Sequence, residues 1–531
     1  MRESLLEKRA KTRLWPQLRA IPHLSIEHLW VMLALAGILW LAFAKPLQLL
    51  DFWWHLKAGE IIWTTRSIPR VDLFSFTAAG RDFVHQNWLS ELVYYLVYRL
   101  GGLPLLICLN GLAIATAFGL VLYLCWESSG SLRIAAACTF LAEALSIGFA
   151  NARPQVFSFP LFAAFYLVLQ RYRRRRGHLL WILPLLMALW VNVHGAFVLG
   201  LMVLFLVTGS ELARRVFGGD NAEALSYQEI GHLALVCLLA LLVTGLNPEG
   251  YGVFSYVRAV QNDPASQKLV TEWQAPTVKR LWDVPFFAAL FLNVLVFIYS
   301  TRRLDFTDLT LFCAFAWLGL ASVRHGIWFA LIMAPILAGQ IPCLDLGPLF
   351  RVLSRFPEGV GRTTRGNSVL RARIAPGTSS SLNCLIAGII VVITLLLSPW
   401  IRPRLPFQSW NYGLLDRKTP LKAMRFIRDH DIRGRIFHPQ HYGDYLIWSL
   451  YPTQKTFIDG RVHLFGEELC RDYIRILNAC DWENLLAKYQ IQFLLLDRTD
   501  QEQHLLGEVR RSDRWERIYE DELSVMYRKK G

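Results

Sequence analysis

Charged residues are scarce in this chain: Asp, Glu, Lys and Arg make up only 18% of its 531 residues. An ordinary soluble domain carries about 25%, so a string of soluble domains is excluded. The sequence also lacks a CxxC metal knuckle, a glycine-rich phosphate loop and an internal repeat. Seven of the nine cysteines lie in or beside apolar runs, which is typical of small core residues and excludes a disulfide scaffold.

Long apolar runs make up much of the chain. Hydrophobic residues make up 54% of the chain, and they cluster in runs from residue 29 to residue 400. A bilayer core needs about 20 mostly apolar residues per helix. The sequence therefore predicts a polytopic α-helical membrane protein with about eleven transmembrane helices, at residues 29–45, 103–126, 132–150, 154–170, 179–193, 196–212, 230–246, 284–300, 306–323, 327–343 and 383–400.

Basic residues indicate the orientation of these spans. With the N-terminus inside, the inside segments hold 21 Lys and Arg, against 11 in external segments of similar total length. This positive-inside bias places the basic segments 1–28 and 344–382 in the cytoplasm. Loops 46–102 and 247–283 and the tail 401–531 are then external, in a periplasm or a lumen. The formal net charge of +15 indicates contact with anionic lipid rather than with nucleic acid.

The tail 401–531 changes in character and predicts a small extramembrane α/β domain. Residues 435–437, 455–458 and 493–496 are short apolar strand candidates, and stretches with helical spacing lie between and before them, at 421–428, 442–450, 467–477 and 482–489. Cys470 and Cys480 lie in this polar part. They could pair if the domain faces an oxidising compartment, although nothing in their spacing demands it.

Cationic and donor side chains gather at the external ends of the predicted helices. Arg153 joins the third and fourth spans, and His194 joins the fifth and sixth. Arg324 and His325 join the ninth and tenth. Ionisable groups at membrane depth are costly and usually face a cavity or a function, so we expect one outward-opening polar pocket. Arginine suits a phosphate group through its planar fork of donors.

Two carboxylates belong to the same set of external groups. Asp51 follows the first span beside aromatic residues, and Glu272 lies in loop 247–283. A carboxylate there could act as a general base or hold a divalent cation such as Mg²⁺ or Mn²⁺. Structural readings stay open: Arg153 and Arg324 could reach lipid head groups, His194 could satisfy a helix end, and Glu272 could pair with a loop lysine.

The first external loop is long and aromatic. Residues 46–102 contain Trp53, Trp54, Trp63 and Trp88, and residues 88–98 form an amphipathic stretch. Such helices lie in the membrane interface, where they would roof a pocket at the outer leaflet. The same tryptophans would also fit an aromatic belt without a catalytic part.

This layout resembles the GT-C superfamily of membrane glycosyltransferases, which includes the catalytic subunit of oligosaccharyltransferase and the protein O-mannosyltransferases. The shared pattern is a first helix, a long external loop with an acid at its start, many further helices and an external C-terminal domain. Asp51 matches the first-loop acid, and the stretch from Asp51 through His55 to Gly59, followed by Asp72, is similar to the loop of the oligosaccharyltransferase subunit.

The C-terminal tail carries a second, fainter similarity. His441 to Leu446, with Asp444, and Phe457 to Arg461, with Asp459, are similar to the external segment that carries acceptor recognition in oligosaccharyltransferase. The tail has no Trp-Trp-Asp triplet, so recognition of an asparagine sequon is not supported, and Phe52 replaces the second acid of the O-mannosyltransferase pair.

The resemblance implies transfer of a sugar from a polyprenyl-phosphate-linked donor to an acceptor on the external face. Asp51 would be the catalytic base or a ligand of a divalent cation, with Glu272 as a second possible ligand. The donor phosphate would be held by Arg153, Arg324, His325 and His194. Acceptor or pocket contacts would come from His55, Asp72, Glu272, Asp444, Asp459 and Arg461.

Two other classes of function stay open from the sequence. A transporter or flippase of an anionic lipid or lipid-linked saccharide could use the same arginines, although such proteins place their sites near the midplane and carry related halves. A non-catalytic assembly protein would explain the external domain but not the gathered charges.

Overall fold

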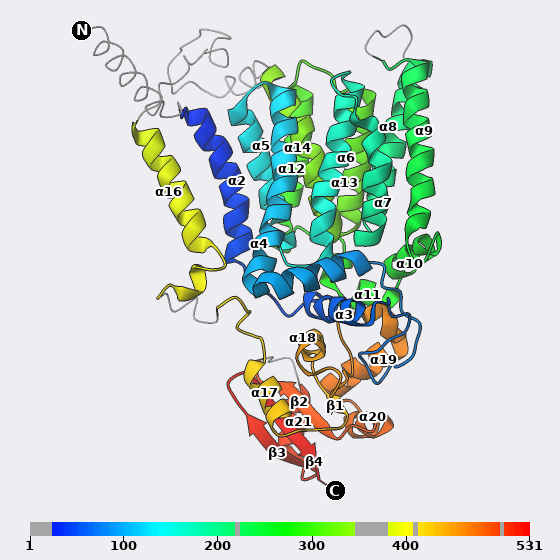
Figure 1. Cartoon of the computed structure of the whole chain (residues 1–531), viewed down its shortest axis with the longest axis vertical. Helices are drawn as coiled ribbons and strands as arrows, with labels where there is room; N and C mark the ends of the chain where they lie inside the picture. Colours follow the sequence, from blue (N-terminus) through cyan, green and yellow to red (C-terminus); the bar gives the residue numbers. More distant parts are fainter. Residues whose placement is uncertain (1–23, 218–223, 346–380, 407–412, 500–503, 531) are drawn as a thin grey trace, which may run out of the picture.

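The structure of this chain is a computed structural model that describes residues 24–217, 224–345, 381–406, 413–499 and 504–530. Most of the two predicted cytoplasmic segments, 1–28 and 344–382, lies outside the described residues. The described part has two layers along its long axis, a bundle of apolar helices and a small α/β domain (Figure 1).

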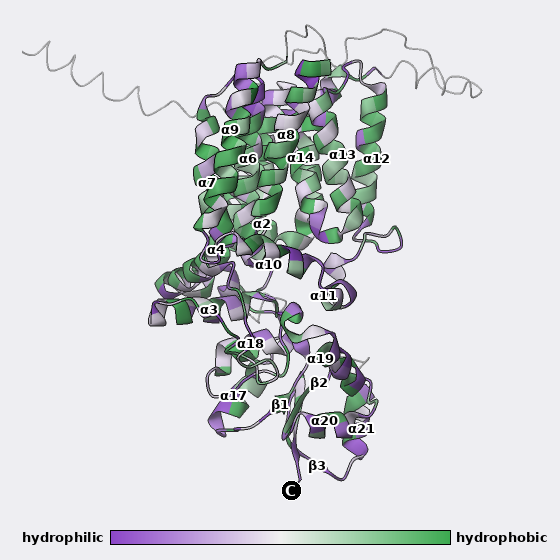
Figure 2. Ribbon diagram, turned by 90° about the vertical axis from the view of Figure 1, so that its right-hand side faces the viewer, coloured by the Kyte–Doolittle hydropathy of each residue, from purple (hydrophilic) through white to green (hydrophobic). Residues whose placement is uncertain are grey.

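The bundle consists of helices that run roughly side by side (Figure 1). These are α2 (Ile26–Ala44), α4 (Trp88–Ser129), α5 (Leu132–Ser146), α6 (Ser158–Arg173), α7 (Leu183–Val193), α8 (Phe197–Phe217), α9 (Tyr227–Val243), α12 (Val284–Tyr299), α13 (Phe306–Ala321), α14 (Gly326–Gln340) and α16 (Ser381–Leu397). Figure 2 shows that they are largely hydrophobic along their length and hydrophilic at their two ends. This distribution is what a bilayer demands of a helix that crosses it.

Six of these helical segments, within the described residues, are long and apolar enough to cross a membrane, and four more are apolar but shorter. The predicted class, a multi-pass α-helical membrane protein, is therefore confirmed. The number of eleven spans stays a prediction.

Helix α14 forms the centre of the bundle. It packs against α4, α5, α12 and α13, and 78% of its apolar stretch is buried, against 33% for α9 at the edge. A helix that is hydrophobic all round is stable only where protein or lipid covers every side, and here protein does. The residues that precede α14 therefore have a fixed position at one end of the bundle.

The first loop, residues 46–102, forms helices that lie across that end of the bundle. Figure 1 shows α3 (Phe52–Thr65) and the first part of α4 in this position. Helix α4 bends at Gly101 and Gly102, and Gly102 has φ 63°, a left-handed conformation that glycine adopts without strain. The bend separates the amphipathic stretch 88–98 from the predicted span 103–126, as the sequence indicated.

Other segments between the bundle helices are short helices and turns. They comprise η1 (Ile147–Phe149), η2 (Pro154–Phe157), η4 (Thr244–Leu246), α10 (Gly252–Gln261), α11 (Pro264–Leu269), η5 (Thr271–Trp273) and η6 (Val323–His325). Two further short helices, η3 (Leu179–Ile182) and η7 (Ile341–Cys343), lie in the bundle, and η8 (Arg402–Arg404) follows α16.

The C-terminal domain is a four-stranded sheet with helices packed around it. Its strands β1 (Ile436–Phe437), β2 (Phe493–Asp497), β3 (Trp515–Glu520) and β4 (Ser524–Lys529) have the order β1-β2-β4-β3, and only β1 and β2 are parallel. Its helices are α17 (Leu421–Asp429), α18 (Gln440–Leu450), α19 (Val462–Leu477), α20 (Trp482–Lys488) and α21 (His504–Arg511). Helix α18 packs on α3, and α19 packs on α11, so the domain contacts the helices at this end of the bundle.

The sequence predicted part of this domain correctly. The strands at 435–437 and 493–496 and the four helices are present. The predicted strand at 455–458 is wrong: this segment makes only one isolated bridge, between Thr456 and Ser75 of the first loop. Strands β3 and β4 were not predicted. Cys470 is buried, Cys480 is exposed, and both are free.

Candidate functional site

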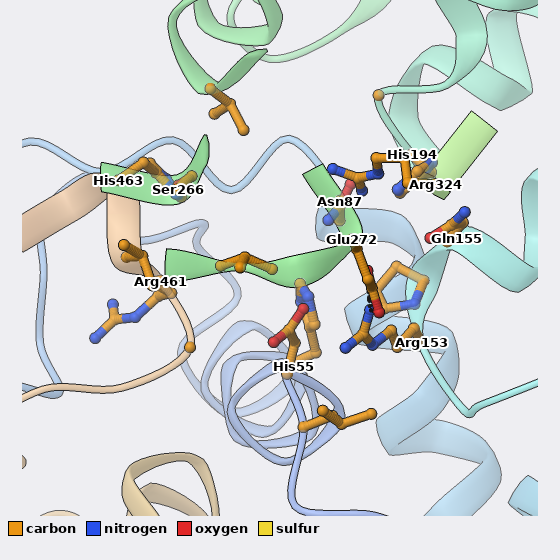
Figure 3. A pocket seen from close by; sticks show the side chains of 18 of the residues that line it. His55, Asn87, Arg153, Gln155, His194, Ser266, Glu272, Arg324, Arg461 and His463 are labelled. Carbon is orange, nitrogen blue, oxygen red and sulfur yellow. Dashed lines mark hydrogen bonds and ion pairs between the residues drawn. The ribbon is translucent and has the colours of Figure 1, made fainter. Parts of the chain in front are cut away.

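A cavity of about 650 Å³ lies where the bundle, helix α3 with the start of α4, and the C-terminal domain meet. Its walls come from segments far apart in the sequence: α3, the loop before α4, η2, the turn between α7 and α8, the segment from α10 to η5, η6, α18 and the start of α19. Figure 3 shows side chains from these segments directed into one space. The cavity brings together nine of the eleven candidate residues from the sequence, namely Asp51, His55, Arg153, His194, Glu272, Arg324, His325, Asp444 and Arg461.

The bundle side of the cavity is cationic. Nη1 of Arg153 lies 2.9 Å from both carboxylate oxygens of Glu272, and the two side chains stand together in Figure 3. The guanidinium of Arg324 lies over the ring of Trp273, 4.2 Å from its centroid. Arg324 forms no ion pair with any described residue. The Nε of Arg153 is buried and has no hydrogen-bond partner among the described residues. Donor capacity is therefore left over on both arginines.

Two histidines lie beside these arginines. His194 precedes α8, and its Nδ1 is 3.1 Å from the Ser158 hydroxyl and 3.2 Å from the Ala196 backbone N–H. Burial, with the nearby charge of Arg324, lowers the pKa of His194 to about 3, so this imidazole is neutral. The Nδ1 of His325 is buried and has no partner among the described residues. The positive charge of this wall therefore comes from the arginines.

The domain side of the cavity carries two carboxylates that face each other across Gly460. A Cβ atom at Gly460 would lie 2.7 Å from Oδ1 of Asp51 and 2.8 Å from Oδ2 of Asp444. The backbone N–H of Gly460 donates to Asp444 at 2.9 Å. Burial raises the pKa of Asp444 well above its usual value, and the adjacent Asp51 raises it further. Burial therefore favours the protonated form of Asp444.

The remaining candidates hold the walls together. The Arg461 guanidinium is 2.7 Å from an oxygen of Asp72 and 2.7 Å from an oxygen of Asp459. All three side chains are almost completely buried. Asp72 and Asp459 do not line the cavity; they neutralise Arg461 and tie the first loop to the C-terminal domain.

A second group of polar side chains in the cavity joins the predicted His55 to two residues that were not predicted from the sequence, Glu91 and His85. Glu91, at the start of α4, is completely buried and accepts from two imidazoles: Nδ1 of His55 is 2.9 Å from Oε1, and Nδ1 of His85 is 3.0 Å from Oε2. All three residues line the cavity. Glu91 interrupts the amphipathic stretch 88–98 on its buried side, and this was the available signal.

Solved structures with a similar fold are known. The Archaeoglobus fulgidus oligosaccharyltransferase in its apo form superposes with a TM-score of 0.50 at 14% identity, over 88% of this chain and 69% of that chain. The same protein tethered to an acceptor peptide containing the NVT sequon gives 0.52 at 12% identity, with the same coverage. ArnT from Cupriavidus metallidurans in the apo state gives 0.50 at 13% identity, over 94% of this chain and 97% of that chain.

The chain has the GT-C fold. No family model matches the sequence, and no curated protein matches it. The GT-C resemblance that the sequence indicated is thus confirmed through the fold, and with it the integral membrane character of the protein.

A divalent cation in the cavity was one of the predictions from the sequence. Among the described residues, no three His, Cys, Asp or Glu side chains are grouped so that they could hold a metal ion. Glu272, one of the two predicted ligands, has both oxygens on Arg153. The role of Asp51 and Glu272 as ligands of a divalent cation stays a prediction.

Proposed function

We propose that this protein is a membrane glycosyltransferase that moves a sugar from a polyprenyl-phosphate-linked donor to an acceptor on the external face. The observation that carries the proposal is a single cavity with two arginines on its bundle side and two carboxylates on its domain side. Such a cavity offers a place for a leaving phosphate opposite a place for an attacking nucleophile. The GT-C fold supports the same class of reaction by analogy.

The arginines are suited to the donor phosphate. Arg153 and Arg324 stand where η2 and η6 leave the bundle, so a lipid-linked phosphate could reach them while its tail stays in the hydrocarbon layer. Arg324 has N–H donors without a partner among the described residues. Arg153 contacts Glu272 through Nη1, and its Nε has no partner there, so it too could donate to a phosphate. Charge develops on the phosphate as the glycosidic bond breaks, and fixed guanidinium groups stabilise that charge. His194 and His325 are further donors at the same wall.

The carboxylates are suited to the acceptor side. Asp51 brings a carboxylate charge to the sugar position, next to Asp444, whose protonated form is favoured by burial. That charge can accept the proton of the nucleophile or stabilise the positive charge that builds on the sugar ring. Arg461, fixed by Asp72 and Asp459, holds the domain wall against the first loop.

Lipid-phosphate binding tests the donor side of the proposal. Full-length protein in nanodiscs is titrated with undecaprenyl phosphate. Arg324→Gln is expected to weaken binding about tenfold to a hundredfold, because a charge-assisted hydrogen bond contributes about 1.5–3 kcal/mol. Arg303→Gln is the matched control, since Arg303 is exposed in the loop between α12 and α13. Equal affinities for all three proteins would contradict the phosphate site.

Loss of transfer tests the acceptor side. Asp51→Asn keeps the size of the side chain and removes its charge. We expect sugar transfer from undecaprenyl-phosphate-linked donors to be abolished while undecaprenyl phosphate still binds. Near-normal transfer by this variant would remove Asp51 from catalysis. Movement of the lipid between leaflets of a vesicle without cleavage would support a flippase instead.

A further inference from the structure

The cavity contains a carboxylate bridged to two imidazoles, the Glu91 cluster, made of His55, His85 and Glu91. Each imidazole uses its Nδ1 to contact a different oxygen of the same carboxylate, at 2.9 and 3.0 Å. The Glu91 side chain has no exposure to solvent, and both rings are nearly buried. A buried carboxylate with two aligned imidazoles fixes their orientation strongly.

The contacts decide which nitrogen carries the proton on each ring. An ionised carboxylate can only accept, so each Nδ1 must donate to Glu91. In a neutral imidazole the other nitrogen, Nε2, then carries the lone pair. No described residue occupies the Nε2 of His55 or of His85 with a hydrogen bond. Both rings line the cavity, so the cluster presents basic nitrogens to the site.

Close packing between two helices holds the cluster in place. A Cβ atom at Gly59 of α3 would lie only 2.0 Å from the carbonyl oxygen of Glu91, so the two backbones are in direct contact there. Helix α3 carries His55, and α4 carries Glu91. The distance between imidazole and carboxylate is therefore set by backbone contact rather than by a flexible loop.

His55 is the ring placed for reaction. It lies four residues after Asp51, and residues at this spacing share one face of a helix. In Figure 3 His55 points from α3 towards Glu272 and Arg153. Trp54 packs against both rings, with centroid distances of 3.5 Å to His55 and 6.3 Å to His85, and Phe83 also covers His85, 4.9 Å away.

We propose that Nε2 of His55 is the base that takes the proton from the acceptor hydroxyl, with Glu91 and His85 as positioning residues; this rests on the proposed glycosyl transfer. The acceptor oxygen forms a bond to the anomeric carbon as the bond from that carbon to the phosphate oxygen breaks. The electron pair of that bond leaves with the polyprenyl phosphate. The hydroxyl proton moves to His55, and Glu91 stabilises the imidazolium until water removes the proton.

This assignment gives Asp51 a separate task. An imidazole is a stronger base near neutral pH than a carboxylate. The Asp51 carboxylate can then stabilise the positive charge on the sugar ring. The two residues on one helix face act on different atoms, so their variants have different signatures.

Chemical rescue separates these signatures. Cleavage is followed with a panel of undecaprenyl-phosphate-linked hexoses and pentoses, with water in the role of the acceptor hydroxyl. His55→Gly is expected to lower cleavage by about a hundredfold to ten-thousandfold, the usual contribution of a general base. Added imidazole should restore much of it in a saturable manner. Asp51→Asn should be equally inactive but insensitive to imidazole, and His430→Gly, at an exposed position of the C-terminal domain, should behave as wild type.

The outcomes distinguish failure of the His55 assignment from failure of the proposed transferase function. Cleavage by wild type and by His55→Gly at similar rates would overturn the base alone, and so would a His55→Gly defect that imidazole leaves unchanged. No cleavage of any donor by wild type would overturn the proposed function and the base together. A tautomer measurement needs no turnover: ¹⁵N-histidine spectra of the full-length protein should give His55, identified with His55→Asn, as the form protonated at Nδ1. Protonation at Nε2 alone would overturn the assignment.

Discussion

Replacement of Arg461 by methionine would remove the only counter-charge that Asp72 and Asp459 have within the part of the chain that the structure describes. The Arg461 Nη1 and Nη2 each lie 2.7 Å from one of these carboxylates. The rings of Phe74 and Phe83 lie 5.0 Å from the guanidinium carbon. Methionine fills a similar volume among these rings, so the main change is two buried carboxylates without their cation.

The expected cost is large. Breaking a buried ion pair by removing one partner destabilises by about 3–5 kcal/mol. Pulse proteolysis of the detergent-solubilised full-length protein in urea measures the stability of the C-terminal domain. For a urea dependence of about 2 kcal/mol per M, the midpoint should fall by about 1.5–2.5 M.

Two comparisons make the result decisive. Arg528 forms an exposed pair with Glu516 at 2.8 Å, and Arg528→Met should cost at most about 1 kcal/mol. A triple variant with Asn at positions 72 and 459 and Met at 461 leaves no buried charge and should recover part of the lost stability. If Arg461→Met shifts the midpoint no more than Arg528→Met, the tie between the first loop and the domain does not depend on this charge.

Three other variants probe close contacts and the acid pair. Gly460→Ala should abolish donor cleavage with little change in melting temperature, because its Cβ would meet the carboxylates of Asp51 and Asp444; unchanged cleavage would contradict their close approach. Gly59→Ala should lower the melting temperature, with a cost of at least about 1–3 kcal/mol, because its Cβ would overlap the Glu91 carbonyl oxygen. The raised pKa of Asp444 means that the folded state binds this proton more tightly than the unfolded state. The stability of the wild type should therefore fall as the pH rises from about 4, the unfolded pKa, up to the folded pKa. Over the same pH range the urea midpoint of Asp444→Asn should fall less. Parallel curves of urea midpoint against pH for the two proteins would contradict the raised pKa.

The features that the sequence predicted well are those set by local composition. Apolar runs of membrane length indicate spanning helices whatever their neighbours are. Strand β2 has an apolar run bounded by polar residues, and it was found for the same reason. Strands β3 and β4 mix apolar residues with charged ones such as Glu516 and Arg528 without a regular pattern. The pairing of β4 with both β2 and β3 makes them strands.

The candidate site was predictable in its membership and less so in its roles. The helix ends that are predicted to be external must lie in one layer at the same side of the membrane. Arg153 and Arg324 were therefore expected near Asp51. Which charges face a cavity and which neutralise one another depends on contacts between distant segments. Asp72 and Asp459 could not be assigned to Arg461 from spacing. Glu91 looked like one polar residue on an amphipathic helix, because its partners come from α3 and from the loop before α4.

The shielding of α14 has a consequence for the protein in different membranes. Helices that face lipid change their tilt when the hydrocarbon layer becomes thinner or thicker. The depth of α14 is set by α4, α5, α12 and α13, which screen it from the acyl chains. Arg324 stands directly before α14, so the height of its guanidinium above α3 does not follow membrane thickness. The same site geometry should then persist in bilayers of quite different lipid composition.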